Sequence, residues 1–380
     1  MTASAKVVLL TGLPTSFLAR KLLPELLTNE ETHIKLVVTD QQHDPTRDHV
    51  ATLGAAAEDR VELVRGDITA MDFGMAGPRF LALARSIDVI QHCVCATTGG
   101  VSRDAELRTY LGSTGEVLEL ALASSGRLQR LVHWGSALLS QPVHGRVSEA
   151  TLVRPETGFR NTADQARFQA EQLLRDAMAR VPITVLRPSL LVGDSQTGEG
   201  DPLSGMYLLM LMLLSSPVDL RLPLPGRGDQ PINLVPIDFV VRAGKTIADD
   251  ARSAGKTFNL VDDRPLSVRR VFELMTQASE RPAPSGKLPT NLASVLLRTP
   301  GLERFSHIPR AFLEQLSGEV IYDSRNTREI LAGTNLECPN AASYIKTLID
   351  EVKRDQQARI KRKSARRDPH FEEMSDPLDS

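Results

Sequence analysis

The sequence has little of the features that mark several protein classes. It contains three cysteines in 380 residues, a small and odd number that argues against a disulfide framework. Its formal net charge of −2 gives no basis for binding nucleic acid. Its longest apolar run, residues 206–214, is too short to cross a bilayer. Because no signal peptide stands at the N-terminus, we expect reduced thiols and a cytoplasmic location.

The composition that remains is that of an ordinary globular chain. Hydrophobic residues make up 41% and charged residues 24%, as in most soluble proteins. A chain of this length can bury a large core. We therefore expect one large domain that carries an elaborated subdomain.

The N-terminal segment predicts a strand, a tight turn and a helix. Four apolar residues, 7–10, lead into Gly12, and a helix-forming run follows within a few residues. Such a turn directs backbone N–H groups and the positive end of a helix at a phosphate. Dinucleotide turns read G-x-G-x-x-G or a close variant, whereas the later positions here are Thr15, Ser16 and Ala19. The spacing therefore predicts a modified nucleotide turn, and an ordinary strand–turn–helix without a ligand remains the alternative.

Further strands alternate with helices along the chain. Helices are expected at 106–124 and 168–179, and strands at 33–39, 60–66, 86–96, 130–137, 183–193 and 257–261. This alternation predicts an α/β fold with a doubly wound, parallel, Rossmann-like sheet. Asp40 follows the second strand, where a carboxylate accepts hydrogen bonds from ribose hydroxyls and favours NAD over NADP. A turn-starting aspartate without a ligand is the alternative for Asp40.

We expect no metal site. Cys93 and Cys95 form a C-x-C pair, but no second pair lies within reach to complete a zinc site. Their alternate positions on a strand place both on one face, so buried thiols are the better interpretation. His92, His133 and His307 share no spacing that predicts a common site, and each is interpreted as structural.

The domain boundaries follow from where the strands stop. We predict a Rossmann-like domain at 1–195 and 232–262 and a smaller, mainly helical substrate subdomain at 196–231 and 263–348. Residues 349–380 form a basic and then an acidic block, which predicts a frayed helix and a charged, disordered tail. The apolar run 206–214 is typical of core packing, of a surface for a hydrophobic or acyl substrate, or of a contact with a protein partner or second copy. The basic block is a second candidate for a partner contact.

Seven stretches of the chain carry a family resemblance. They are TGLPTSFLAR at 11–20, VRGDI at 64–68, DVIQHCVCA at 88–96, LVHWGSA at 131–137, RFQAEQLL at 167–174, LRPSLLVGDSQTGEG at 186–200 and LVPIDFVV at 234–241. They are spread along most of the segment 5–262. The chain resembles the extended short-chain dehydrogenase/reductase family, and within it the fatty acyl-CoA reductase and thioester reductase branch. The resemblance implies NAD or NADP as cofactor.

The resemblance also implies a catalytic set, from which this chain departs. The family uses Tyr-x-x-x-Lys, in which the lysine cation helps a phenol to donate a proton near neutrality, together with a serine and an asparagine. By position the serine is Ser136 and the lysine is Arg167, but the tyrosine is Ala163 and the asparagine is Tyr110.

The standard family mechanism is therefore not available to this chain. Arg167 keeps a positive charge that could hold ribose hydroxyls or a phosphate, but it has no usable deprotonated form. Ala163 has no proton to donate. Tyr110 could supply a displaced phenol, although a packed helix tyrosine is the alternative. Ser136 could bond a substrate carbonyl, or be a strand-end serine without a function. The implied catalytic set is thus Ser136, Arg167 and Tyr110.

The cofactor contacts implied by the resemblance span the whole predicted sheet. They are Gly12, Thr15, Ser16, Phe17, Leu18, Asp40, Asp67, Ile68, Cys95, Ala96, Arg167, Pro188 and Leu190.

Two functions stay open on the sequence. The first is an NAD(P)-dependent oxidoreductase acting on a small acyl or other carbonyl substrate through a non-standard acid. The second is a catalytically silent pseudoenzyme that binds a nucleotide or ligand, or serves as an assembly subunit. A lyase or epimerase of the same fold would also need the missing tyrosine.

Overall fold

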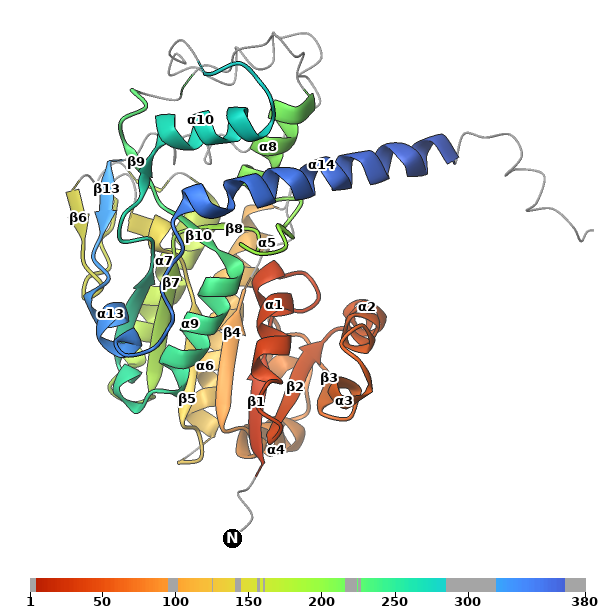
Figure 1. Ribbon diagram of the computed structural model, residues 1–380. Helices are drawn as coiled ribbons and strands as arrows, with labels where there is room; N and C mark the ends of the chain where they lie inside the picture. The colour runs from red at the N-terminus through yellow and green to blue at the C-terminus, as the bar shows by residue number, and fades with distance from the viewer. Residues whose placement is uncertain are drawn as a thin grey trace, which may run out of the picture. The chain divides into compact units, whose positions relative to one another are not determined.

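The computed structural model describes residues 5–94, 102–124, 126–140, 145–155, 158–159, 161–215, 224, 227–284 and 319–365. The chain divides into two compact units (Figure 1). Unit 1 comprises Met1–Leu191, Asn233–Pro265 and Ser317–Pro339, and unit 2 comprises Val192–Ile232, Leu266–Leu316 and Asn340–Ser380.

Unit 1 is built on one seven-stranded sheet of order β11-β7-β5-β4-β1-β2-β3. All of the recorded pairings in it are parallel. The strands are β1 (Lys6–Leu10), β2 (Thr32–Val38), β3 (Val61–Arg65), β4 (Val89–Cys93), β5 (Arg130–Trp134), β7 (Ile183–Pro188) and β11 (Lys256–Leu260). The strand order reverses between β1 and β4, and in such sheets ligands bind outside the carboxyl ends of the strands at that point. The predicted doubly wound, Rossmann-like sheet is confirmed.

The period of two along each strand places apolar side chains on both faces of the sheet. Val8 and Leu10 pack in one core with residues of α1 (Phe17–Leu26) and α9 (Ile237–Asp249). Leu9 packs in the other core with residues of α4 (Gly77–Ser86), α6 (Ser113–Ala123) and α7 (Thr162–Ala177). The sheet therefore lies between two helix layers (Figure 1).

Shorter elements connect this framework. They are α2 (Asp40–Ala51), α3 (Ala55–Glu58), η1 (Met71–Gly74), α5 (Arg103–Leu107), the π-helical turn η2 (Arg108–Gly112), η3 (Ala137–Ser140), η4 (Ala251–Ser253) and α13 (Arg325–Leu331). Two small sheets pair β6 (Gly145–Val147) with β13 (Val320–Tyr322) and β8 (Leu190–Val192) with β10 (Leu234–Pro236).

Two predicted elements are interrupted. The strand predicted at 183–193 ends at Pro188, and β8 then joins another sheet. Between them Ser189 donates its N–H to Leu260 O and its hydroxyl to Asn233, which turns the chain out of the large sheet. The helix predicted at 106–124 contains the π-helical turn η2 between α5 and α6.

Unit 2 contains three helices and one short strand pair among its described residues. The helices are α8 (Gly205–Ser215), α10 (Val268–Ala278) and α14 (Ala341–Ala365), and β9 (Pro231–Ile232) pairs with β12 (Leu266–Ser267). Both α8 and α10 pack against α14. Two boundaries differ from the predicted ones. Residues 319–339 lie in unit 1 rather than in the cap, and α14 continues through residues 349–365, within the segment that was predicted to hold a frayed helix and a disordered tail.

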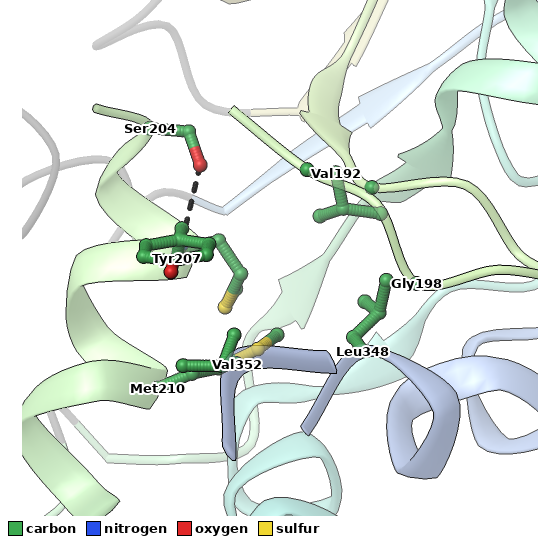
Figure 2. Close-up of a pocket in the computed structure, with 10 residues that line it drawn as sticks. Val192, Gly198, Ser204, Tyr207, Met210, Leu348 and Val352 are labelled. Carbon is green, nitrogen blue, oxygen red and sulfur yellow. Dashed lines mark hydrogen bonds between the residues drawn. The ribbon is translucent and has the colours of Figure 1, made fainter. Parts of the chain in front are cut away.

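The apolar helix α8 packs inside unit 2. Six of its residues are buried and the others are half-buried. Figure 2 shows Tyr207 and Met210 of α8 on one side of a pocket and Leu348 and Val352 of α14 on the other. That pocket holds only about 10 Å³, room for about one water molecule. The structure therefore favours core packing over an exposed partner surface or an acyl site in this pocket. Within the described ranges, no helix is both long enough and apolar enough to cross a membrane.

Candidate functional site

The turn between β1 and α1 lies against the end of β4. Gly12 has φ +100°, and a Cβ built on it would lie 2.1 Å from the carbonyl oxygen of Cys93. Only glycine fits both this backbone conformation and this contact. The turn closes with hydrogen bonds to Gly12 O from Ser16 N (2.8 Å) and Thr15 Oγ1 (3.2 Å). The one glycine that the sequence retains is therefore the one that the strand–turn packing requires.

The start of α1 fits a pyrophosphate. Ser16 caps the helix by accepting a hydrogen bond from Ala19 N at 3.2 Å. The N–H groups of Phe17 and Leu18, the first two of the helix, have no acceptor within it by helix geometry. The first turn carries no acidic residue, so it keeps the positive potential that attracts phosphate. The residues at the predicted second and third glycine positions thus leave a usable anion-binding helix end.

The end of β2 offers both an acceptor and a cation. Asp40, the first residue of α2, lies 3.1 Å from the Arg65 guanidinium at the end of β3, and both side chains are exposed. Asp67 is less available to a ligand, because its carboxylate already accepts hydrogen bonds from Thr69 N (2.9 Å) and Thr69 Oγ1 (2.7 Å). Ile68 packs against the core beneath α4 and α6. At the carboxyl end of β2 and β3, Asp40 and Arg65 are the side chains placed to bind a ribose or its phosphate.

Arg167 and Tyr110 form a close pair. The Arg167 guanidinium donates a hydrogen bond to the Tyr110 hydroxyl at 2.5 Å, and its Cζ lies 4.5 Å from the centre of the Tyr110 ring. Asp164, one turn earlier on α7, lies 3.4 Å from the same guanidinium. Tyr110 is only 4% exposed. The structure thus brings together the cation at the lysine position and the phenol at the asparagine position.

The π-helical turn η2 aims Tyr110 at Arg167. Single π turns inside α-helices are rare and often lie at functional sites. Here the turn contacts α7, which carries Arg167. Thr114 Oγ1 donates to Tyr110 O at 2.7 Å, and Ser113 Oγ donates to Thr109 O. Side-chain hydroxyls therefore bond carbonyls in the segment where the helix changes its repeat.

A buried polar chain connects this turn with the nucleotide turn. Thr11, the residue before Gly12, bonds His92 Nδ1 through its hydroxyl at 3.0 Å. His92 Nε2 lies 3.1 Å from Thr114 Oγ1 on α6. His92 is fully buried, and this burial, with a smaller effect from His133, holds its pKa well below the usual 6.5. The imidazole is therefore neutral and fixed at both ring nitrogens.

The other predicted site residues have local partners or lie outside the described residues. Ser136 accepts a hydrogen bond from Leu138 N at 3.2 Å, at the start of η3, and η3 contacts α7. Pro188 is buried at the end of β7, and Leu190 is half-buried in β8. Cys95 and Ala96 fall outside the described residues. Cys93 is buried, as predicted, and burial raises its thiol pKa.

A buried ion pair supports the floor of the site. Arg187 donates through Nε to Glu171 Oε2 at 2.9 Å and to Oε1 at 3.0 Å, and both residues are almost fully buried. Arg175 adds a bond to Glu171 at 3.1 Å. Removing one partner of such a pair costs about 3–5 kcal/mol, because the other charge is left buried. Since Glu171 lies one turn after Arg167, this cluster fixes α7 against β7.

Thr114 was not predicted as a site residue, and His92 was predicted to be structural. The full burial of His92 and its two hydrogen bonds are consistent with that prediction. The available signal was a histidine inside an otherwise apolar strand that ends at the nucleotide turn. A buried histidine must have hydrogen-bond partners, and the partners lie on elements whose contacts the sequence does not specify.

A larger pocket of unit 1 lies at the edge strand β11. It has a volume of about 380 Å³ and is lined in part by Asp262, Asp263, Arg328 and Cys338. Burial, and then Asp262 and Asp263, raise the pKa of the Cys338 thiol, which makes it a poor nucleophile. In the strand order β11 is far from β1 and β4. This pocket is therefore not the dinucleotide crevice.

Comparison with known families and proteins agrees with this geometry. The model of an NAD-binding family described as male sterility protein matches residues 10–244. The glycine betaine reductase ATRR of Emericella nidulans is 28% identical over 285 residues, which are 71% of this chain and 22% of that protein. The chain thus spans about a fifth of the length of this relative.

Solved structures show the same fold. The terminal R domain from the myxalamid PKS-NRPS biosynthetic pathway matches with a TM-score of 0.77 and 23% identity, over 94% of this chain and 92% of that one. The reductase (R) domain of a nonribosomal peptide synthetase from Mycobacterium tuberculosis matches with a TM-score of 0.69 and 18% identity, over 92% of each chain.

Proposed function

The chain belongs to the NAD-binding family described as male sterility protein, and on that premise we propose that it reduces an acyl or other carbonyl substrate with NAD(P)H, using Tyr110 beside Arg167 as the acid. Membership confirms the predicted resemblance to reductases of the extended short-chain dehydrogenase/reductase type. It also confirms NAD(P) as the cofactor class at the level of the family. The substrate and the acid are our proposals.

The observation that carries the proposal is the contact between Arg167 and Tyr110. A phenol that gives up its proton leaves a negative charge, which needs a cation close by. Arg167 supplies one at 2.5 Å from the hydroxyl oxygen and keeps its charge at every working pH. Ala163, at the usual tyrosine position, cannot donate a proton. The pair therefore restores a phenol beside a cation, with the cation at the usual lysine position and the phenol at the asparagine position.

The chemistry balances with these residues. When bound, NADH or NADPH would supply the hydride for the new C–H bond. Tyr110 gives its proton to the carbonyl oxygen, Arg167 stabilises the phenolate, and solvent returns the proton to Tyr110. With an aldehyde or ketone the product is an alcohol, and with a thioester the products of the first reduction are an aldehyde and a thiol. The similar protein of Emericella nidulans is a glycine betaine reductase, and glycine betaine carries a carboxylate, which supports a carboxyl-level substrate.

The competing function is a silent binding protein. It is favoured by the alanine at position 163 and by the loss of the later turn glycines. It predicts that cofactor binds without turnover, whereas the reductase proposal predicts both binding and turnover.

The test uses the purified full chain with NADH or NADPH against acyl-thioester, aldehyde and ketone panels. We expect Tyr110→Phe to lower turnover at least 100-fold while cofactor affinity, measured by calorimetry, stays within threefold. Tyr207→Phe removes a phenol from α8 of unit 2 and is the matched control, expected to keep its turnover. Turnover only in the double variant Ala163→Tyr with Arg167→Lys would overturn the reductase proposal in favour of a silent protein.

A further inference from the structure

We infer that His92 is a positioning residue that holds Tyr110 in register with the nucleotide turn through a single directed chain of hydrogen bonds. This inference rests on the proposed function, in which Tyr110 is the acid. His92 itself touches neither the Tyr110 hydroxyl nor the surface where the cofactor would bind, so it can act only by positioning.

The direction of the chain follows from the donors available. Thr114 Oγ1 uses its one hydrogen to bond Tyr110 O at 2.7 Å, so towards His92 it can only accept. His92 therefore carries its proton on Nε2, 3.1 Å from that hydroxyl. Its Nδ1 must then be an acceptor.

The other end of the ring fits this tautomer. Thr11 Oγ1 accepts a hydrogen bond from Cys93 N at 3.1 Å and lies 3.0 Å from His92 Nδ1. Its hydrogen points to Nδ1, since the alternative acceptor, Cys93 O, is 3.5 Å away. The chain of hydrogen bonds thus runs from Cys93 N–H through Thr11, His92 and Thr114 to the carbonyl of Tyr110, and at every step a donor faces an acceptor.

The end point of the chain is the π-helical turn. In this turn Tyr110 O accepts a hydrogen bond from Ser113 N and a second one from Thr114 Oγ1 at 2.7 Å. The Thr114 hydroxyl is therefore the group that ties the turn to His92. If the turn relaxed to the α-helical register, the following side chains would rotate by about 100° relative to those before. Tyr110 would then leave the face of Arg167.

At the other end of the chain of hydrogen bonds, Thr11 accepts from Cys93 N–H and directly precedes Gly12. A cofactor that packs on the Gly12 turn and the acid that serves it are therefore held by one rigid connection. His92 is suited to this role, because its neutral, fully buried ring accepts a hydrogen bond at Nδ1 and donates one at Nε2. The ring centre of the neighbouring His133 lies 5.6 Å from that of His92. The Nδ1 of His133 has no hydrogen-bond partner among the described residues.

Three variants of His92 separate the two ends of the ring. In His92→Gln the amide can still donate towards Thr114, whereas His92→Asn reaches only towards Thr11 and His92→Leu reaches neither. We expect kcat to fall at least tenfold for the asparagine and leucine variants and less than threefold for glutamine. The KM for cofactor should change less than threefold in all three. His133→Leu is the matched control, because His133 is a buried histidine that is not part of the chain of hydrogen bonds, and this variant should keep kcat.

A double-mutant cycle tests whether His92 acts through Tyr110. In a Tyr110→Phe background, His92→Leu should have no further effect on kcat, because the acid it positions is gone. Additive losses, or equal kcat for the glutamine and asparagine variants, would overturn the inference. A wild-type chain without turnover, or a Tyr110→Phe variant with full turnover, would instead count against the proposed function.

One measurement is independent of activity. Histidine-ring ¹⁵N NMR of the labelled full chain reports the tautomer of His92 directly. We expect a neutral ring protonated at Nε2 at pH 7, and a ring protonated at Nδ1 would overturn the inference even if no substrate is found.

Discussion

The carbonyl oxygen of Cys93 fills the space that a side chain on residue 12 would need. A Cβ built on Gly12 would lie 2.1 Å from that oxygen, and the backbone there has φ +100°. The turn that would receive the pyrophosphate and the end of β4 are therefore in direct contact. Any movement of one displaces the other.

This contact predicts that Gly12→Ala damages both stability and cofactor binding. A left-handed φ alone costs an alanine about 1–2 kcal/mol, and the overlap with Cys93 O must be relieved by moving the turn. We expect Gly12→Ala to lose more unfolding free energy than this backbone cost, and to lose at least tenfold in affinity for NAD(P)H. Urea unfolding and calorimetric titration measure the two effects.

Gly54→Ala is the matched control for this prediction. Gly54 has φ +93°, close to that of Gly12, but no atom lies within 4 Å of a Cβ built there. It should show the cost of the backbone conformation alone and keep cofactor affinity. Equal losses in the two variants would mean that the contact with Cys93 has no energetic effect.

The sheet could be predicted because its determinants are local. Runs such as 7–10 are apolar throughout, and this is sufficient to predict a buried parallel strand. The exit of the chain at Ser189 was not predictable, because it depends on Asn233 from a distant segment. The π turn at Tyr110 depends in the same way on its packing against α7, a distant segment.

The candidate site could be predicted only in part, for a related reason. The positions of Arg167 and Tyr110 followed from the family pattern, but a pattern does not show that two side chains 57 residues apart touch. The same holds for the ion pair of Glu171 and Arg187, which joins a helix to the next strand. Such pairs are set by tertiary packing, which period and composition do not encode.

The pair of Asp40 and Arg65 bears on the choice between NAD and NADP. A carboxylate here accepts hydrogen bonds from free ribose hydroxyls, whereas an arginine can pair with the 2′-phosphate of NADP. Because Arg65 lies 3.1 Å from Asp40, it can turn from the carboxylate to the phosphate. We expect Arg65→Ala to weaken NADPH at least fivefold more than NADH.

Calorimetric titration with both cofactors measures this difference. Arg60→Ala is a suitable control, because Arg60 precedes the same strand and is held by Leu27 O and Asn29 O instead. It should leave the ratio of the two affinities unchanged. An unchanged ratio in Arg65→Ala would show that Arg65 only neutralises Asp40.

His133 makes the stability of the fold depend on pH. Its burial lowers its pKa to about 4, with Glu171 opposing and Arg187 adding to that shift. In the unfolded chain a histidine titrates near 6.5. Between these values the unfolded chain binds the extra proton, so stability falls as pH falls from about 6.5 towards 4. From pH 7 to pH 5 this histidine should remove about 2 kcal/mol of unfolding free energy.

Urea unfolding of wild type and His133→Leu at pH 7 and pH 5 isolates this effect, since all other groups are common to both chains. The unfolding free energy of the leucine variant minus that of wild type should be about 2 kcal/mol larger at pH 5 than at pH 7. His33→Leu is the control, because His33 is exposed on β2 and its replacement should leave the pH dependence as in wild type. If His133→Leu shows the wild-type slope, the buried ring is protonated within the fold, and Glu171 rather than burial dominates its titration.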